Sequence, residues 1–179
     1  AINALLRYIM RVLRKQLIRS GLFFLALVAT NVWSMEAESE LSKAAEKGNI
    51  VLVKQILDTK NVDRDTLNAA FWIAIKKGNP AIVERFLQAG VNIELRAEHA
   101  LTPLMQAARD GREQVVEMLL AANAEVNAVS EELDTALILA AEKDRRKVIP
   151  LLLAAHADVN AKRNNGMTAL TLAAQEGYQ

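Results

Sequence analysis

The feature that most constrains this chain is a period of 33 residues. Threonines, leucines and pairs of alanines each recur at this spacing in the second half of the sequence. The recurring positions are Thr102, Thr135 and Thr168; Leu104, Leu137 and Leu170; and Ala107-Ala108, Ala140-Ala141 and Ala173-Ala174. Gly78, Val83 and Phe86 hold matching places in an earlier copy, and Gly48 and Val53 do so in another after a contraction of three residues. Such a period predicts units that stack and bury an apolar face against each neighbour.

Within one unit the residues predict two helices joined by a tight turn. Thr102 can cap a helix N-terminus with its hydroxyl, and Pro103 suits the first helical position. Gly111 can end that helix in a left-handed conformation. A second helix follows, and Val115 and Leu119 belong to its apolar stripe.

The residues at the predicted helix ends support these assignments. Two slots hold only residue types that tolerate a positive φ, namely Gly48, Gly78, Gly111, Asp144 and Gly177 after the first helices, and Gly90, Asn123 and His156 after the second. A backbone requirement therefore accounts for His156. Pro150 is expected in the first turn of its helix if that helix begins near Lys147.

Composition excludes several classes of function. The chain has no cysteine, which removes disulfides, thiolate metal sites and cysteine nucleophiles. Residues 35–179 hold 17 basic and 21 acidic residues, a net charge of −4, so no basic stripe for nucleic acid is expected. The two histidines, His99 and His156, differ in repeat phase, which argues against a shared metal site. We expect no enzyme activity, no cofactor and no bound metal.

Residues 1–34 have the order of a secretory signal peptide. A basic stretch from Arg11 to Arg19 precedes the uncharged apolar run 21–29, and small residues then lead to a cleavage point before Met35 or after Ala29. Met10 is a natural start, which would place residues 1–9 upstream of it. The alternative is an uncleaved membrane anchor at residues 11–33, although the uncharged stretch is shorter than a typical spanning helix.

The repeats resemble ankyrin repeats. The resemblance rests on the sequence Thr102-Pro103-Leu104 with Ala107-Ala108 and Gly111, on the stripe of the second helix, and on Ala157-Asp158-Val159-Asn160-Ala161. It covers about residues 38–179 and implies an all-α solenoid of four repeats and a partial fifth, preceded by the signal-peptide helix, with the repeat domain spanning 35–179. The implied repeats are 38–64, 65–97, 98–130, 131–163 and the partial 164–179.

Two departures from the family pattern carry expectations. Met105, Ile138 and Thr171 replace the histidine that usually follows Thr-Pro-Leu, which implies the loss of its hydrogen bonds. The fifth copy stops after its first helix, so Leu170, Leu172 and Ala173 are expected to lack a covering helix. Either the product is truncated or a lone helix caps the stack, and we favour truncation.

The resemblance also implies where a partner would bind, because ankyrin stacks bind through their turn tips and the concave face of the first helices. The matching positions are Asp65, Thr66, Asn68, Lys76, Lys77, Arg96, Glu98, His99, Leu101, Arg109, Asp110, Val129, Glu131, Glu132, Asp134, Glu142, Lys143, Lys162, Asn164, Asn165, Met167, Gln175 and Glu176. Among these, Leu101 and Met167 are expected to be exposed apolar anchors. Phe71 and Trp72 are expected in the core, and Arg145-Arg146-Lys147 on a solvated face.

The sequence therefore predicts an exported interaction module that binds a protein partner, is a monomer and does not bind nucleic acid. The predicted location is periplasmic or secreted, with membrane attachment only through an uncleaved 11–33 segment. The alternative function is a spacer or tether within a longer ankyrin-repeat protein.

Overall fold

The computed structural model describes residues 40–59 and 62–177, and every regular element in these ranges is helical. The chain divides into two units, Ala1–Glu40 and Leu41–Gln179, and the repeats lie in the second. A helical segment at 40–46 precedes α3. The other helices are α3 (Ile50–Thr59), α4 (Arg64–Lys77), α5 (Pro80–Gln88), the 3-10 turn η1 (Glu98–Ala100), α6 (Pro103–Asp110), α7 (Glu113–Ala121), α8 (Ala136–Glu142), α9 (Val148–Ala154) and α10 (Ala169–Gln175). The predicted signal peptide, residues 1–34, lies outside the described residues.

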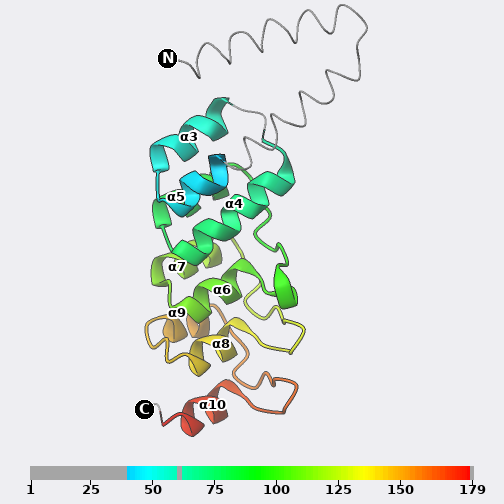
Figure 1. The fold of residues 1–179 in the computed structure, drawn as a ribbon. Coiled ribbons are helices and arrows are strands. Elements are labelled where there is room, and N and C mark those ends of the chain that lie inside the picture. The colour runs from blue at the N-terminus through cyan, green and yellow to red at the C-terminus, as the bar shows by residue number, and fades with distance from the viewer. Residues whose placement is uncertain (1–39, 60–61, 178–179) are drawn as a thin grey trace, which may run out of the picture. The chain divides into compact units, whose positions relative to one another are not determined.

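The helices form two parallel rows, as the solenoid prediction requires. The first helices of successive repeats, α4, α6, α8 and α10, pack in order against one another, and the second helices α3, α5, α7 and α9 do the same. Figure 1 shows the two rows side by side, with the connecting loops projecting to the side of the first-helix row. Each repeat therefore contacts only its neighbours in the stack.

Threonine caps begin three of the first helices, as predicted. The hydroxyls of Thr102, Thr135 and Thr168 accept hydrogen bonds from the backbone N–H groups three residues later, at 3.2, 3.3 and 3.3 Å. Pro103 occupies the first turn of α6. These caps satisfy donors that would otherwise be orphaned at the helix start.

The predicted positive-φ positions are all confirmed. The five turns that follow the first helices have φ between 52° and 75°, and Asp144 supplies the lowest of these values. The three second-helix ends are also left-handed, with φ of 74° at Gly90, 65° at Asn123 and 63° at His156. Lys147 is the N-cap of α9, so Pro150 lies in the first turn and removes no hydrogen bond within the helix.

The residues that replace the family's histidine make cap hydrogen bonds of their own in two of the three repeats. Thr171 Oγ1 accepts from the Thr168 N–H at 2.7 Å and so completes a reciprocal cap. Met105 Sδ accepts weakly from the Thr102 N–H at 3.5 Å. Ile138 has no polar side-chain atom and makes no such bond. In two of the three repeats, therefore, the N–H of the capping threonine is bonded by a side chain other than histidine.

The core runs along the stack between the rows, and the last repeat departs from the others. Leu104 and Leu137 are 1% and 3% exposed, whereas Leu170, at the same repeat position, is 75% exposed, as expected. Leu172 contradicts the expectation because it is buried on the side of α10 that packs against α8. The last helix is therefore docked on one face and open on the other.

The two neighbouring aromatic residues of α4 have different surroundings. Phe71 is fully buried, as predicted, and its ring centroid lies 6.0 Å from that of Phe86. Trp72 is only half-buried, and the Lys76 Nζ lies 5.9 Å from the centre of its ring. The prediction that Trp72 belongs to the core is wrong, and its position allows a cation–π contact at the surface. Across the described ranges, no helix is long and apolar enough to span a membrane.

Candidate partner-binding surface

Three loops of matching structure project from the ends of the first helices. In each loop a backbone N–H donates to the carbonyl four residues later at 3.0 Å, from Ala97 to Leu101, from Ser130 to Asp134 and from Arg163 to Met167. We call these the three hairpins, residues 97–101, 130–134 and 163–167. Their equal geometry follows from the repeat, because each is flanked by the same helix caps.

Hydrogen bonds join neighbouring hairpins into one row. The Glu131 N–H donates to the His99 carbonyl at 3.1 Å, and the Asn164 N–H donates to the Glu132 carbonyl at 3.0 Å. Arg96 Nη1 donates to the Val129 carbonyl at 2.7 Å. The backbone of the row is thereby fixed while its side chains stay available to a partner.

A second ladder joins the turns that leave the second helices. Asn127 Oδ1 accepts from the Asp158 N–H at 2.8 Å, and its Nδ2 donates to the His156 carbonyl at 3.2 Å. One repeat earlier, Glu94 Oε1 accepts from the Glu125 N–H at 2.8 Å. Asn127 and Glu94, which occupy the same repeat position, therefore each join their own turn to the next one.

Most of the predicted binding residues lie at the surface. The exposed ones are Asp65, Lys76, Lys77, Arg96, Glu98, His99, Val129, Glu131, Glu132, Lys143, Lys162, Asn164, Asn165, Gln175 and Glu176. The half-buried ones are Asn68, Leu101, Arg109, Asp110, Glu142 and Met167, and the buried ones are Thr66 and Asp134. The exposed members concentrate on the hairpins and at the C-terminal ends of the first helices.

Asp134 is not a surface residue, which corrects the prediction for this position. Its Oδ1 lies 2.5 Å from Arg163 Nε, and both side chains are largely buried. Arg163 Nη2 lies 2.5 Å from Glu142 Oε2. Burial alone would raise the pKa of Glu142, but hydrogen bonds and charge from Arg163 and Lys143 lower it below its ordinary value. The hydrogen bond to Asp134 and the two carboxylates likewise raise the pKa of Arg163.

The predicted apolar anchors are also corrected. Leu101 and Met167 are half-buried and pack against the core. The exposed large apolar side chains of the hairpin row are instead Val129 and Leu133, at 43% and 45% exposure. Leu133 was missed by sequence reasoning, although its alignment with Gly166 one repeat later is a signal that could have found it.

Several polar candidates are engaged within the stack. The amide of buried Gln106 donates to Asp110 Oδ2 at 2.6 Å and accepts from Arg109 Nη2 at 2.7 Å. Asn68 Oδ1 accepts from the Asn92 N–H at 3.3 Å. Thr66 serves the N-terminus of α4, where its N–H and hydroxyl donate to Asp63 and hold the pKa of that carboxyl below its usual range. The polar atoms of these residues therefore bond within the stack and support the binding surface from beneath.

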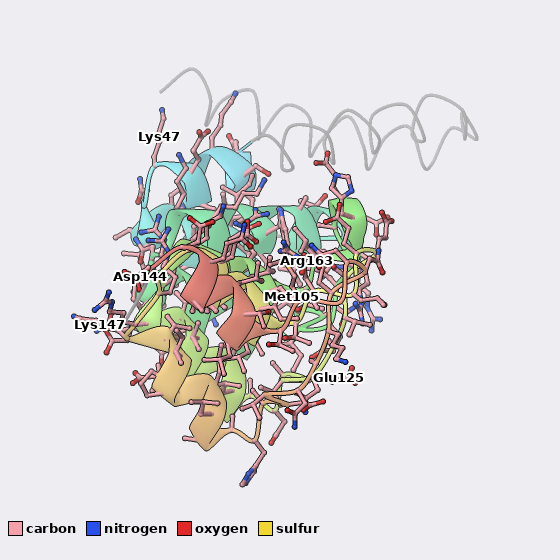
Figure 2. All side chains as sticks on the ribbon, turned by 90° about the horizontal axis from the view of Figure 1, so that it is seen from below. Lys47, Met105, Glu125, Asp144, Lys147 and Arg163 are labelled. Carbon is pink, nitrogen blue, oxygen red and sulfur yellow. The ribbon has the colours of Figure 1, made fainter. Side chains whose placement is uncertain are left out.

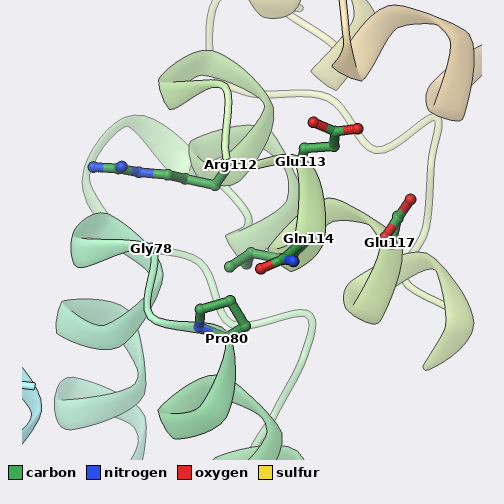
Figure 3. Close-up of a pocket in the computed structure, with 7 residues that line it drawn as sticks. Gly78, Pro80, Arg112, Glu113, Gln114 and Glu117 are labelled. Carbon is green, nitrogen blue, oxygen red and sulfur yellow. The ribbon is translucent and has the colours of Figure 1, made fainter.

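Arg145 also departs from the solvated face predicted for the basic run. Its Nε donates to the Arg109 carbonyl at 2.8 Å across a repeat boundary. Arg112, one repeat earlier, donates to the Lys76 carbonyl at 3.2 Å and extends over Gly78 (Figure 3). Both arginines therefore bind the carbonyl end of the preceding first helix, which favours a positive charge.

The other two members of the basic run remain exposed and are paired. Arg146 Nε lies 2.8 Å from Asp144, and Lys147 Nζ lies 3.6 Å from Glu113. Figure 2 places Asp144 and Lys147 at one edge of the molecule, with Arg163 and Glu125 toward the other. The basic run and the hairpin row thus lie at different edges.

The two best-defined hollows in the described ranges do not resemble small-molecule sites. The larger of the two best-defined hollows is an open, mostly polar cleft of about 400 Å³ lined by Gly78, Pro80 and residues 112–115 and 117 (Figure 3). Ligand sites are usually more enclosed and apolar than this. Residues 40–59 and 62–177 contain no group of three or more histidine, aspartate or glutamate side chains that could hold a metal ion.

Family comparison agrees with this architecture. The model described as "Ankyrin repeats (3 copies)" matches residues 41–130, and the model described as "Ankyrin repeat" matches residues 132–164. The chain belongs to the ankyrin-repeat family. Ankyrin repeats generally mediate protein–protein interactions and are generally not enzymes. No curated protein matches the chain.

Proposed function

We propose that this ankyrin chain is an exported interaction module that binds a protein partner through its hairpin row and first-helix face. The observation that carries the proposal is the hydrogen-bonded row itself. Contacts from His99 to Glu131 and from Glu132 to Asn164 fix three hairpins in one register. A surface that is already ordered loses little conformational entropy on binding.

The chemistry of this surface favours a protein over a nucleic acid. Glu98, Glu131 and Glu132 expose carboxylates on adjacent hairpins, where they would repel phosphates. Arg96 directs its guanidinium to the carbonyls of Ala100 and Val129. Exposed apolar side chains beside charged ones are typical of protein interfaces.

Site-specific cross-linking in cells of the source organism tests the proposed surface. A photoreactive residue replaces Glu98 or Asn165 on the hairpins, and matched controls replace Glu84 or Gln114, which are exposed on the second helices. The proposal predicts one cross-linked partner from both hairpin positions and none from the controls. Partners captured only from the second helices, or from no position at all, would refute it.

Export is part of the same proposal and rests on residues 10–34, with the mature domain beginning near Met35. The proposed location is periplasmic or secreted. Intact mass and fractionation of the chain expressed from Met10 in a Gram-negative host test this. A soluble periplasmic product that starts near Met35 supports export, whereas a full-length product in the membrane fraction supports the 11–33 anchor.

A second candidate, a spacer within a longer ankyrin-repeat protein, is favoured by one observation. Leu170 is 75% exposed, whereas Leu104 and Leu137, on helices that another repeat follows, are buried. A further repeat would cover this side chain in the same way. If the hairpin positions capture nothing and only the Leu170 face is protected in cells, the spacer function is favoured instead.

A further inference from the structure

We propose that Leu133 is the apolar anchor of the hairpin row, and that the partner offers an apolar pocket edged by lysine or arginine side chains. This inference rests on the proposed function and assigns it a residue and a partner chemistry. Leu133 has φ of 61°, in the left-handed region that a branched, bulky residue rarely occupies.

The repeat itself shows what this position otherwise holds. The equivalent residues are Ala100, with φ of 55°, and Gly166, with φ of 80°. Glycine adopts this conformation without steric penalty, and a small residue adopts it more readily than leucine. Leucine is therefore placed here against the local backbone preference.

Burial offsets only part of that penalty. The Leu133 side chain is 45% exposed, so its apolar surface contributes less to the core than a buried leucine would. A strained backbone conformation persists only where the surrounding structure holds it in place, and such conformations cluster at binding sites. An exposed, strained leucine is better explained by a contact made outside the chain.

The loop around Leu133 is held tightly. The Leu133 N–H donates to the Ser130 carbonyl at 3.1 Å. The hydroxyl of Ser130 accepts from the Glu132 and Asp134 N–H groups at 3.2 and 3.1 Å. Asp134 is in turn paired with Arg163. An anchor presented by a loop this well ordered gains affinity because little freedom is lost on binding.

The charges next to the anchor indicate the partner's rim. Glu131 and Glu132 directly precede Leu133, and Glu98 lies on the adjacent hairpin; all three are exposed. The nearby basic side chains already have contacts within the row, since Arg96 Nη1 donates to the carbonyls of Ala100 and Val129 and His99 Nδ1 lies 3.6 Å from Glu131. Lys162 directly precedes the third hairpin and is exposed. Acidic side chains around an apolar anchor complement a pocket with basic edges.

Two substitutions separate an anchor from a structural residue. Leu133→Gly matches the residue at the next repeat's equivalent position and relieves the backbone strain, so the melting temperature should stay unchanged or rise. Leu133→Asn keeps a side chain that tolerates the left-handed region and serves as the second variant. A residue needed for stability would instead lower the melting temperature in both variants.

The test uses the full-length chain and the partner captured by cross-linking from Glu98 or Asn165, then purified. Both Leu133 variants should bind it at least about 30-fold more weakly, the change that marks a hot spot. Glu131→Gln with Glu132→Gln should slow association and flatten its salt dependence, because rim charges act on encounter.

The outcomes are distinguishable. Binding within twofold of wild type for both Leu133 variants would overturn the anchor and leave the proposed function standing. Association of the Glu131→Gln, Glu132→Gln variant that is faster than wild type would overturn the basic rim. Failure of every hairpin position to capture a partner would overturn both the anchor and the proposed function.

Discussion

Arg163 Nε lies 2.5 Å from Asp134 Oδ1, and this pair ties the third hairpin to the start of α8 across a repeat boundary. The same guanidinium reaches Glu142 at the other end of α8. At the position of Asp134 the neighbouring repeats place Leu101 and Met167, so an ion pair here replaces an apolar contact. Its partial burial makes it sensitive to the loss of either partner.

Arg163→Ala should destabilise the chain by about 2–4 kcal/mol, because it leaves the Asp134 carboxylate buried without a counter-ion. Arg146→Ala removes an exposed pair with Asp144 and should change stability much less than Arg163→Ala does, because water screens that pair. Chemical denaturation measures both. The double variant Asp134→Leu, Arg163→Met should recover part of the loss, since no charge then remains buried. Equal effects of Arg163→Ala and Arg146→Ala would contradict this account.

Acid should weaken the stack in a defined way through Glu142. Its pKa is lowered in the folded state, so the ionised carboxylate contributes stability that is present above its ordinary pKa of 4.5. That contribution is lost as the pH falls below 4.5 through the folded-state value. As the pH is lowered from 5 to below 4.5, the melting temperature of Glu142→Gln should therefore fall less than that of the wild type. Parallel pH profiles for the two proteins would argue against the assignment.

Gly111→Ala should be more destabilising than Gly90→Ala, although both glycines have φ near 74°. A Cβ at Gly90 meets nothing within 4 Å, so only the left-handed conformation costs about 1 kcal/mol there. A Cβ at Gly111 would lie 2.8 Å from Arg145 Cδ and displace the guanidinium from the Arg109 carbonyl. That lost hydrogen bond should add about 1 kcal/mol.

Arg145→Ala provides the matching control for that comparison. In this background Gly111→Ala and Gly90→Ala should cost the same, because the side chain that the new Cβ would meet is gone. Urea titration of the wild type, of Arg145→Ala and of each glycine variant in both backgrounds gives two double-mutant cycles. A difference between the glycines that persists without Arg145 would refute the proposed contact.

Leu137→Ala and Leu170→Ala make the same change at equivalent positions with different surroundings. Leu137 is 3% exposed, so its truncation leaves a cavity and should cost about 2–5 kcal/mol. Leu170 is 75% exposed, and its truncation should change stability by about 0.5 kcal/mol or less. Thermal melts of both variants give the comparison, and a large loss at Leu170 would mean that another part of the chain covers this face.

Local chemistry explains which features the sequence could predict. Caps and helix ends depend on residue types at fixed offsets, so Thr102, Gly111 and Asp144 could be assigned from the repeat alone. Pro150 could likewise be placed in the first turn of its helix from the helix start near Lys147. These assignments need no knowledge of which side chains meet across a repeat boundary.

Contacts between repeats explain what the sequence did not predict. Asp134 pairs with a residue 29 positions away, and nothing local distinguishes it from an exposed turn aspartate. Leu101 and Met167 pack against the core, a contact that their positions in the repeat pattern did not reveal. The exposed leucine of the second hairpin is Leu133, whose backbone has a positive φ, as do Ala100 and Gly166 at the equivalent positions.

Hydroxyl-radical footprinting of the full-length chain with its purified partner tests the central claim most directly. The account predicts reduced side-chain oxidation at Leu133 and His99, with Leu153 and Leu170 unchanged. Leu153 and Leu170 serve as internal controls because both are exposed and neither lies on a hairpin, Leu153 being on α9 and Leu170 on α10. Protection of Leu153 or Leu170 with no change at the hairpins would contradict the account and move the partner to the end of the stack.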